Sequence, residues 1–396
     1  MSNLPHELLD HIVDLLHDNQ TPLRNCCLVS KSWVARTRRH LFAEVVFQTM
    51  MSLESWKKTF PDPSTSPARY VKALSIGYPQ VVTAPDAEAG RWMAAFSRVE
   101  CLELGGQNLH ARGWEVAFVL FHGFSPVVKS IRMKWSSLPF LRFLYLILTF
   151  PLLEDLAMIN CHNEPPIDGD YSDWSSTVVQ SPSSPTFTGS LELLLRGGMG
   201  LIADRLLSLP NGICFRKLTL SWFREEDVSL TVALVERCSR TLESLDISCN
   251  SCGTSTGHLC LYTDNLLLFL GQSRSSFNLS KATKLSDAVF RLGSLNVEWV
   301  ILALQTAGDE HQDLRRISID VPSYLTRIHP DIRAAIGEGT FGQWLDLDSL
   351  LVHLWESRSI RPSVIRTWTG GNQAVGDCIG SLLPEMMKRG MIDLVE

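Results

Sequence analysis

The chain has 396 residues, of which 45% are hydrophobic and 20% are charged. This composition predicts a folded protein, because disordered chains combine few apolar residues with a large net charge. At roughly 150 residues per domain, the length predicts two or three domains or one extended repeat array. The net charge of −6 disfavours a primary role in binding nucleic acid, whose phosphates attract basic surfaces.

The sequence predicts an intracellular protein, in the cytoplasm or the nucleus, without a membrane partner. Its first residues, MSNLPHELLDHIV, lack the basic start and unbroken apolar run of a secretory signal. Its ten cysteines show no regular spacing, which fits a reducing compartment better than a disulfide framework. The most apolar stretch, Leu138 to Leu153, is shorter than the roughly 20 residues of a bilayer span, so we predict buried core there.

Three short helices are predicted at the N-terminus. Pro5 suits the first turn of a helix from about Pro5 to His17, and Thr21-Pro22 marks the start of a second. Ser30 is positioned to cap the third. The apolar face of the first helix is wider than one neighbour covers, so the bundle either binds a partner or packs on the rest of the chain.

The order and spacing of the apolar residues over 4–42 resemble an F-box. Leu4-Pro5, the segment Cys27-Leu28-Val29-Ser30-Lys31-Ser32-Trp33 and Leu41-Phe42 carry the resemblance. It implies that the helices bind the Skp-type adaptor of a Skp–cullin–F-box ubiquitin ligase and, through it, the cullin. The residues that it divides between the adaptor interface and the small core are Leu4, Pro5, Leu8, Ile12, Leu15, Leu23, Cys27, Val29 and Trp33. The sequence does not separate these two groups.

A basic cluster lies near the end of the third predicted helix, formed by Arg36, Arg38, Arg39 and His40. Cations at this position complement the helix dipole, so we predict a solvated face, with a phosphate-binding patch as the alternative.

One phrase recurs after the proline-rich segment 60–67: apolar, two variable, apolar, one variable, apolar. Its copies are Val71/Leu74/Ile76, Val99/Leu102/Leu104, Val128/Ile131/Met133, Leu153/Leu156/Met158, Phe215/Leu218/Leu220, Leu242/Leu245/Ile247, Leu314/Ile317/Ile319 and a weaker Thr188/Leu191/Leu193. Successive copies begin about 25 to 35 residues apart, except for a wider gap between Leu242 and Leu314. This period is typical of long leucine-rich repeats, in which each copy gives one strand and a return segment.

The predicted fold class is therefore α/β: an N-terminal three-helix F-box, then an irregular leucine-rich-repeat-like solenoid with a helical C-terminal cap. The best copy, from Leu242 to Cys252, has Asn250 at the turn position, and the copy ending at Cys161 has cysteine there. A non-repeating α/β domain with several similar strands is the alternative. The side chains expected on the concave face, where a target protein would bind, are Glu103, Arg132, Lys134, Lys217, Thr219, Ser244, Asp246, Arg316 and Ser318.

The predicted domains follow from these patterns. They are the F-box at 1–47, a linker at 48–69, a repeat domain at 70–320 with insertions near 163–190 and 249–281, and a C-terminal cap at 321–396. A helix in the cap is predicted from Trp344 to Trp355, whose apolar residues have helical spacing.

No catalytic residue, metal ligand or cofactor is predicted. The glycine pattern from Gly337 to Gly342 lacks the other motifs of a kinase or dinucleotide fold, so we interpret it as a turn before the C-terminal helix. Cys249 and Cys252 could belong to a zinc site with His258, but small buried thiols of the repeat explain them more simply. An enzyme is accordingly not expected.

The sequence as a whole resembles a fungal group of F-box proteins with degenerate leucine-rich repeats. Phrases such as Leu209-Pro210-Asn211-Gly212 and Leu354-Trp355-Glu356-Ser357 carry this wider resemblance. It implies a non-catalytic substrate-recognition subunit of a ubiquitin ligase, with an unknown protein as its target. The alternative is a leucine-rich-repeat interaction scaffold without a ligase role.

Overall fold

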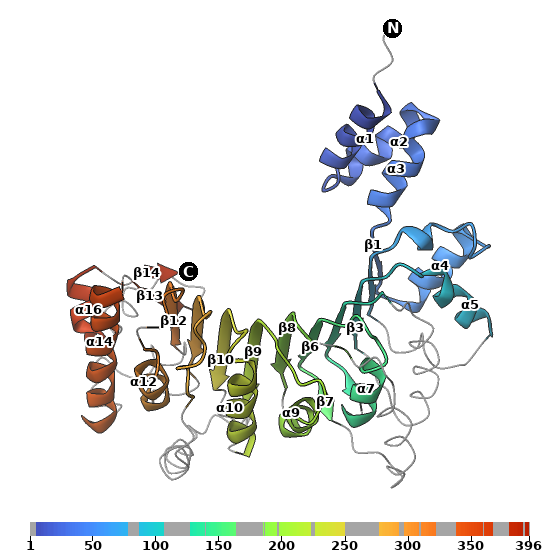
Figure 1. Cartoon of the computed structure of the whole chain (residues 1–396). Helices are drawn as coiled ribbons and strands as arrows, with labels where there is room; N and C mark the ends of the chain where they lie inside the picture. Colours follow the sequence, from blue (N-terminus) through green and yellow to red (C-terminus); the bar gives the residue numbers. More distant parts are fainter. Residues whose placement is uncertain are drawn as a thin grey trace. The chain divides into compact units, whose positions relative to one another are not determined.

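The computed structural model of the chain is shown in Figure 1. It describes residues 5–77, 87–106, 127–138, 140–163, 185, 187–195, 198–222, 226–249, 277–292, 297–308, 310–321, 338–358, 360–366, 380–390 and 393–395. The chain divides into two compact units, which we call the N-terminal unit (Met1–Thr186) and the C-terminal unit (Phe187–Glu396).

The first three helices form a small bundle, as the sequence predicts. They are α1 (His6–Leu15), α2 (Gln20–Val29) and α3 (Lys31–Leu41). The Ser30 side chain accepts a hydrogen bond from the Ser32 N–H and so caps α3, as predicted. The second helix begins one residue before Thr21, because Asn19 rather than Thr21 caps it. Buried Val13, Leu23 and Cys26 form the core of the bundle.

The N-terminal unit continues with a parallel sheet. Its strands, in spatial order, are β1 (Glu44–Phe47), β2 (Ala73–Ile76), β3 (Cys101–Gly105), β4 (Ser130–Lys134) and β6 (Asp155–Ile159). The connecting segments include α4 (Met50–Thr59), the 3₁₀ helix η1 (Pro67–Tyr70), α5 (Ala87–Ala95) and α7 (Phe140–Ile147). Two short strands, β5 (Ser137–Leu138) and β7 (His162–Asn163), pair in parallel beyond β4 and β6.

Residues 48–69, predicted as a linker, contain helix α4. Thr49 and Ser52 form a reciprocal capping box at its start, a local signal that the sequence carries. Trp56 of α4 packs edge-on against Phe47 and also contacts Phe96, with ring centroids 5.8 and 6.1 Å apart. The segment is therefore part of the packed unit, and β1 already begins the sheet within residues 1–47.

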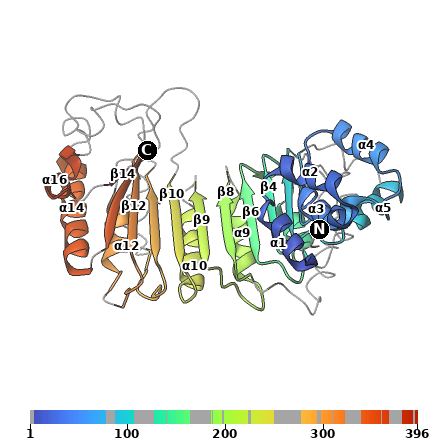
Figure 2. The same ribbon diagram turned by 90° about the horizontal axis from the view of Figure 1, so that it is seen from above.

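The C-terminal unit also has a parallel sheet. Its strands, in spatial order, are β8 (Ser190–Leu194), β9 (Lys217–Trp222), β10 (Ser244–Cys249), β11 (Asp287–Arg291), β12 (Arg316–Val321), β13 (Arg361–Arg366) and β14 (Asp393–Val395). The helices are α9 (Met199–Leu207), α10 (Glu226–Cys238), α12 (Glu298–Gln305), α14 (Glu338–Arg358) and α16 (Pro384–Lys388). Helices α9, α10, α12 and α14 cover one face of this sheet, whose strands lie side by side in the same direction (Figures 1 and 2).

The repeated apolar phrase forms the core of both units. In seven of the eight predicted copies all three apolar positions are buried, and the exception is the weak copy, whose Thr188 is only half-buried. Because side chains alternate across a strand, the variable residue between the last two positions faces away from the helices. Both sheets therefore have the architecture of leucine-rich repeats, and each has one face, called here the helix-free face, that none of the described repeat helices covers.

The wide gap between Leu242 and Leu314 contains a copy that sequence analysis missed. Leu285, Ala288 and Phe290 are fully buried, and β11 pairs in register with β10 on one side and β12 on the other. Sequence analysis missed this copy because its middle position is Ala288, whereas the other copies have a large apolar residue there.

The C-terminal region differs in part from the predicted helical cap. Helix α14 is present, and Trp344, Leu347 and Leu351 are buried along it. However, β13 and β14 extend the sheet through this region, so residues 321–396 are not purely helical. Helix α14 starts at Glu338, so Gly339 and Gly342 lie in its first turns rather than in a turn before it.

Cysteine occupies a buried turn position, as predicted for the copy that ends at Cys161. The Cys161 Sγ lies 3.7 Å from the Met133 carbonyl oxygen of the neighbouring copy and 3.6 Å from the Ile159 carbonyl oxygen. Burial raises the pKa of this thiol to about 11, so it remains protonated and able to donate at neutral pH. Asn250 and Cys252 of the best copy lie outside the described residues.

Other sequence predictions have mixed outcomes. Phe140, Phe143, Ile147 and Leu153 of the most apolar stretch are buried, as expected. Most of the two predicted insertions, 164–184 and 250–276, lies outside the described residues.

Among the helices that the structure describes, none has the length and apolar character needed to cross a membrane. Within the same part of the chain, no group of histidine, cysteine and acidic side chains is arranged to hold a metal ion.

Candidate functional site

The N-terminal bundle exposes an apolar surface. Leu8, Ile12 and Leu15 are spaced by four and three residues along α1, so they share one side of this helix, and they are 49%, 41% and 69% exposed. At the end of α2, Leu28 and Val29 are 86% and 69% exposed. Exposed apolar residues on a small bundle, such as these on α1 and α2, are typical of a protein-binding surface.

The structure separates the predicted adaptor residues into surface and core. Leu8, Ile12, Leu15 and Val29 are exposed, whereas Leu23 is fully buried within the bundle and cannot contact a partner without unfolding. Pro5 is exposed ahead of α1, Cys27 and Trp33 are half-buried, and Leu4 lies outside the described residues. Leu28, the most exposed apolar residue described in the bundle, is absent from the predicted set, although it lies in the segment that carries the resemblance.

Ion pairs hold α1 against α3. Asp14 accepts hydrogen bonds from Nε and Nη2 of Arg36, and His40 Nε2 lies 2.7 Å from Asp14 Oδ1. The hydrogen bonds from Arg36 and then His40 outweigh desolvation and hold the Asp14 pKa far below its ordinary value. The basic cluster is thus not one solvated face: Arg36 and His40 bridge two helices, while Arg38 and Arg39 are exposed.

We expect the bundle to lose stability in acid. A carboxyl group whose pKa is lowered by folding stabilises the folded state above its unfolded pKa of about 3.9, and this stabilisation disappears as the pH falls towards the folded pKa. Wild type and Asp14→Asn should therefore differ in hydrogen-exchange protection of α1 at pH 6, and the difference should shrink progressively as the pH falls below about 3.9. Comparison at matched pH cancels the intrinsic pH dependence of exchange. Equal protection at pH 6 would contradict the role of Asp14.

The helix-free face of the N-terminal sheet carries three of the predicted target residues. Glu103 of β3 pairs in register with Arg132 of β4, and the Lys134 Nζ lies 2.9 Å from Glu103 Oε2. Arg132 is exposed, whereas Glu103 and Lys134 are half-buried. Glu103 and Arg132 lie between buried residues of their strands, and Lys134 follows buried Met133, so all three side chains point away from the core.

The helix-free face of the C-terminal sheet contains a three-residue ion network. Arg291 donates from Nε and Nη2 to Asp246 at 2.9 and 2.8 Å, and its Nη1 lies 3.2 Å from Asp320 Oδ2. The Asp246 and Asp320 side chains are 19% and 7% exposed. The hydrogen bonds to Asp246 raise the Arg291 pKa above its ordinary value, so the guanidinium stays charged.

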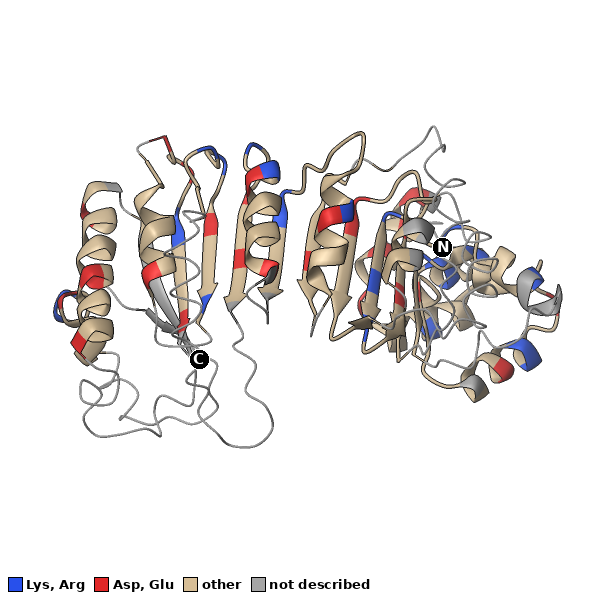
Figure 3. Cartoon of the chain, turned by 90° about the horizontal axis from the view of Figure 1, so that it is seen from below, with Lys and Arg blue, Asp and Glu red and all other residues tan. Residues whose placement is uncertain are grey.

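The remaining predicted target residues lie on the strands of the same sheet. Thr219 and Ser244 are half-buried, and Lys217 is exposed on β9. Ser318 is almost fully buried and offers little surface to a partner. Figure 3 shows residues of both signs distributed along the strands of this sheet. Sequence analysis missed Arg291 and Asp320, the former because it lies on the unrecognised copy and the latter because it is one residue beyond the repeated phrase.

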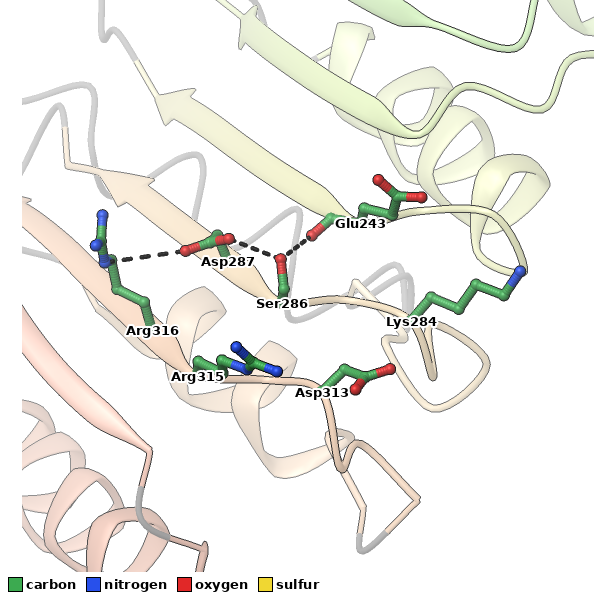
Figure 4. Close-up of a pocket in the computed structure, with 7 residues that line it drawn as sticks. All are labelled: Glu243, Lys284, Ser286, Asp287, Asp313, Arg315 and Arg316. Carbon is green, nitrogen blue, oxygen red and sulfur yellow. Dashed lines mark hydrogen bonds and ion pairs between the residues drawn. The ribbon is translucent and has the colours of Figure 1, made fainter.

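A pocket of about 600 Å³ lies at the N-terminal ends of β10, β11 and β12 (Figure 4). Its lining residues are Glu243, Lys284, Ser286, Asp287, Asp313, Arg315 and Arg316. The Ser286 Oγ lies 2.7 Å from Asp287 Oδ2, and Arg316 Nε lies 3.9 Å from Asp287 Oδ1. Three carboxylates face three cations, and the lining includes neither cysteine nor histidine.

Comparisons with known proteins do not identify a family for this chain. No protein-family model matches the sequence, and no curated protein matches it. Among solved structures, the leucine-rich repeat-containing protein LegL7 from Legionella pneumophila aligns with 80% of this chain and 91% of its own. The sequence identity is 14% and the TM-score is 0.37. The description of this chain as a leucine-rich-repeat scaffold rests on its own strand register and buried apolar triplets, an architecture suited to binding other proteins.

Proposed function

We propose that this chain is the substrate-recognition subunit of a Skp–cullin–F-box ubiquitin ligase. The bundle α1–α3 binds the Skp-type adaptor and, through it, the cullin, and the helix-free faces of the repeats bind a target protein. The observation that carries this proposal is the exposed apolar surface on a bundle that already has its own core. The sequence resemblance of residues 4–42 to an F-box names the partner.

The bundle fits an adaptor because its core and its exposed surface use different residues. Leu23, Val13 and Cys26 stabilise the fold internally, so Leu8, Ile12 and Leu15 are not needed for packing. Exposed apolar side chains lower solubility unless a partner covers them. The Asp14–Arg36 ion pair fixes the angle between α1 and α3, which keeps the apolar surface rigid before binding.

In this function the chain performs no chemistry. Holding a target lysine beside a ubiquitin carrier raises the effective concentration of the two reactants, and that positioning is the contribution of the subunit. We expect the protein to act inside the cell, in the cytoplasm or the nucleus, and the resemblance to the fungal F-box group supports the same assignment. No cofactor is required.

The test is adaptor binding by the full-length chain. The variant Leu15→Gln/Leu28→Gln keeps helix-forming side chains of similar size but removes two apolar anchors. We expect its affinity for a purified Skp-type adaptor to fall about 100-fold by calorimetric titration, because each anchor contributes about 1.5 kcal/mol. Circular dichroism should show an unchanged fold.

The matched control is Met51→Gln/Leu201→Gln, which alters two exposed apolar residues outside the bundle. It should bind the adaptor as wild type does. If a folded wild-type chain does not bind the adaptor, or if both double variants bind equally, the ligase function is wrong. A leucine-rich-repeat scaffold without a ligase role would then be the better account.

A further inference from the structure

Helices α2 and α3 of the N-terminal bundle carry cations and no carboxylate. Residues 19–43 contain five arginines and lysines but neither aspartate nor glutamate. Arg36 is paired with Asp14 of α1. The other four cations are Arg24, Lys31, Arg38 and Arg39. All four are exposed, and no carboxylate in the described part of the chain lies within ion-pair distance of them. These two helices, which pack side by side (Figure 1), therefore have a surplus of positive charge.

Two of these cations flank the exposed apolar residues at the end of α2. Arg24 precedes Leu28 by four residues, so the two side chains lie on the same side of the helix. Its hydrogen-bond partner is an uncharged side chain, that of Gln20, at 3.4 Å. Lys31 follows Val29 closely, on the other side of the turn into α3. An apolar centre with charged groups at its edge is the usual composition of a protein-binding surface.

Lys31 occupies a position where a cation does not help the fold. It is the first residue of α3, and the N-terminal end of a helix carries partial positive charge, which favours acidic side chains. The first turn of α3 contains no acidic residue that would compensate. In contrast, Arg38 and Arg39 lie in the last turn, where cations complement the dipole. The stability of its own helix therefore does not explain the charge of Lys31.

We propose that Arg24 and Lys31 form, with Leu28, a contact area for an acidic surface of the Skp-type adaptor. The leucine enters an apolar site on the adaptor, and the two cations lie opposite carboxylates at the edge of that site. Unpaired cations attract such a surface before contact and raise the rate of association. This inference rests on the proposed function, which supplies the identity of the partner, whereas the charges on α2 and α3 supply its chemistry.

The distribution of charge over the bundle favours a protein over a membrane or a nucleic acid. Helix α1, which carries the other exposed apolar residues, also carries exposed Glu7 and Asp10. An anionic bilayer or a phosphate backbone that covered α1 as well as α2 would be repelled by these two carboxylates. The net charge of the chain, −6, acts in the same direction. A protein surface can be acidic opposite α2 and α3 without being acidic opposite α1.

The first test measures how fast the full-length chain associates with a purified Skp-type adaptor, by stopped-flow fluorescence. Because salt screens the attraction, the wild-type rate should fall about tenfold between roughly 50 and roughly 500 mM NaCl. Arg24→Glu/Lys31→Glu should associate about tenfold more slowly at the lower salt concentration, and its rate should no longer fall as salt is added. Equal rates for the two chains at low salt overturn the inference.

The matched control is Arg98→Glu/Lys281→Glu, which reverses two exposed cations outside the bundle and changes the net charge by the same amount. It should associate within about twofold of the wild-type rate, because these residues do not flank the apolar contact. A control that slows association as much as Arg24→Glu/Lys31→Glu would show that the net charge sets the rate, and the inference would be wrong.

A stability measurement separates a binding role of Lys31 from a structural one. Because a carboxylate is favourable at the start of a helix, Lys31→Glu alone should not lower the melting temperature of the chain. The same variant should associate with the adaptor about threefold more slowly at low salt. A lower melting temperature would show that Lys31 stabilises the bundle, and would overturn its assignment to the partner.

The results also distinguish this inference from the ligase function. A chain that does not bind the adaptor at any salt concentration refutes both. A chain that binds at a rate independent of salt and of the two cations keeps the ligase function and refutes the inference alone. Sedimentation with vesicles of phosphatidylcholine and phosphatidylserine completes the test. If wild type binds these vesicles and Arg24→Glu/Lys31→Glu does not, the cations serve a membrane and the inference is wrong.

Discussion

Phe290→Ala is expected to lower the free energy of unfolding of the C-terminal unit by about 4 kcal/mol, the usual cost of truncating a buried phenylalanine. Phe290 is fully buried in β11 and packs edge-on against Trp299 of α12, with ring centroids 5.6 Å apart. The substitution removes the largest side chain of the copy that the apolar phrase did not reveal. Urea unfolding followed by hydrogen exchange of peptides from α12 should show a midpoint about 1.5 M lower.

Val289→Ala is the matched control, since the neighbouring residue of the same strand lies on the helix-free face and is half-buried. It should lower the stability by much less. Equal effects of the two substitutions would mean that β11 does not present Phe290 to the core, and the repeat would then have a true gap between β10 and β12.

Arg291→Gln is expected to lower the stability of the same unit by about 2 kcal/mol at pH 7. The glutamine retains hydrogen-bonding capacity but leaves the poorly exposed Asp246 and Asp320 carboxylates without a shared cation. Removing one member of such a network costs more than removing an exposed ion pair, because the remaining charges stay desolvated. Thermal unfolding of the full-length chain, monitored in the C-terminal unit, measures the effect.

Two further variants test whether the loss of stability in Arg291→Gln comes from the unpaired carboxylates. The double variant Arg291→Gln/Asp320→Asn removes the unpaired charge and should recover part of the loss. Arg316→Gln removes a more exposed cation that lies 3.9 Å from Asp287, and it should change stability by less than about 0.5 kcal/mol. If Arg291→Gln is as mild as Arg316→Gln, the network does not contribute to the stability of this unit.

Local sequence signals determined the secondary structure and the repeat. The alternation in Leu102-Glu103-Leu104 predicts a strand with one buried face, since successive side chains point to opposite sides. Ser30 predicts the start of α3 because its hydroxyl can accept from an orphan N–H of the first turn. Each of these signals depends only on residues a few positions apart, which is why the fold class and several of the predicted surface residues could be found without the structure.

Only the tertiary structure decided which of these residues are available and how they are paired. Leu23 and Leu15 have the same chemistry in the sequence, but the packing of the bundle buries Leu23 on α2 and leaves Leu15 at the end of α1 exposed. Arg291 meets Asp246 and Asp320 because strand register aligns residues about 30 to 45 positions apart in the chain.

The left-handed backbone of Trp135 likewise depends on its hydrogen bond to Ile159 of the next copy. Burial, ion pairing and strain are set by contacts between distant segments, and these contacts leave little trace in the local sequence pattern.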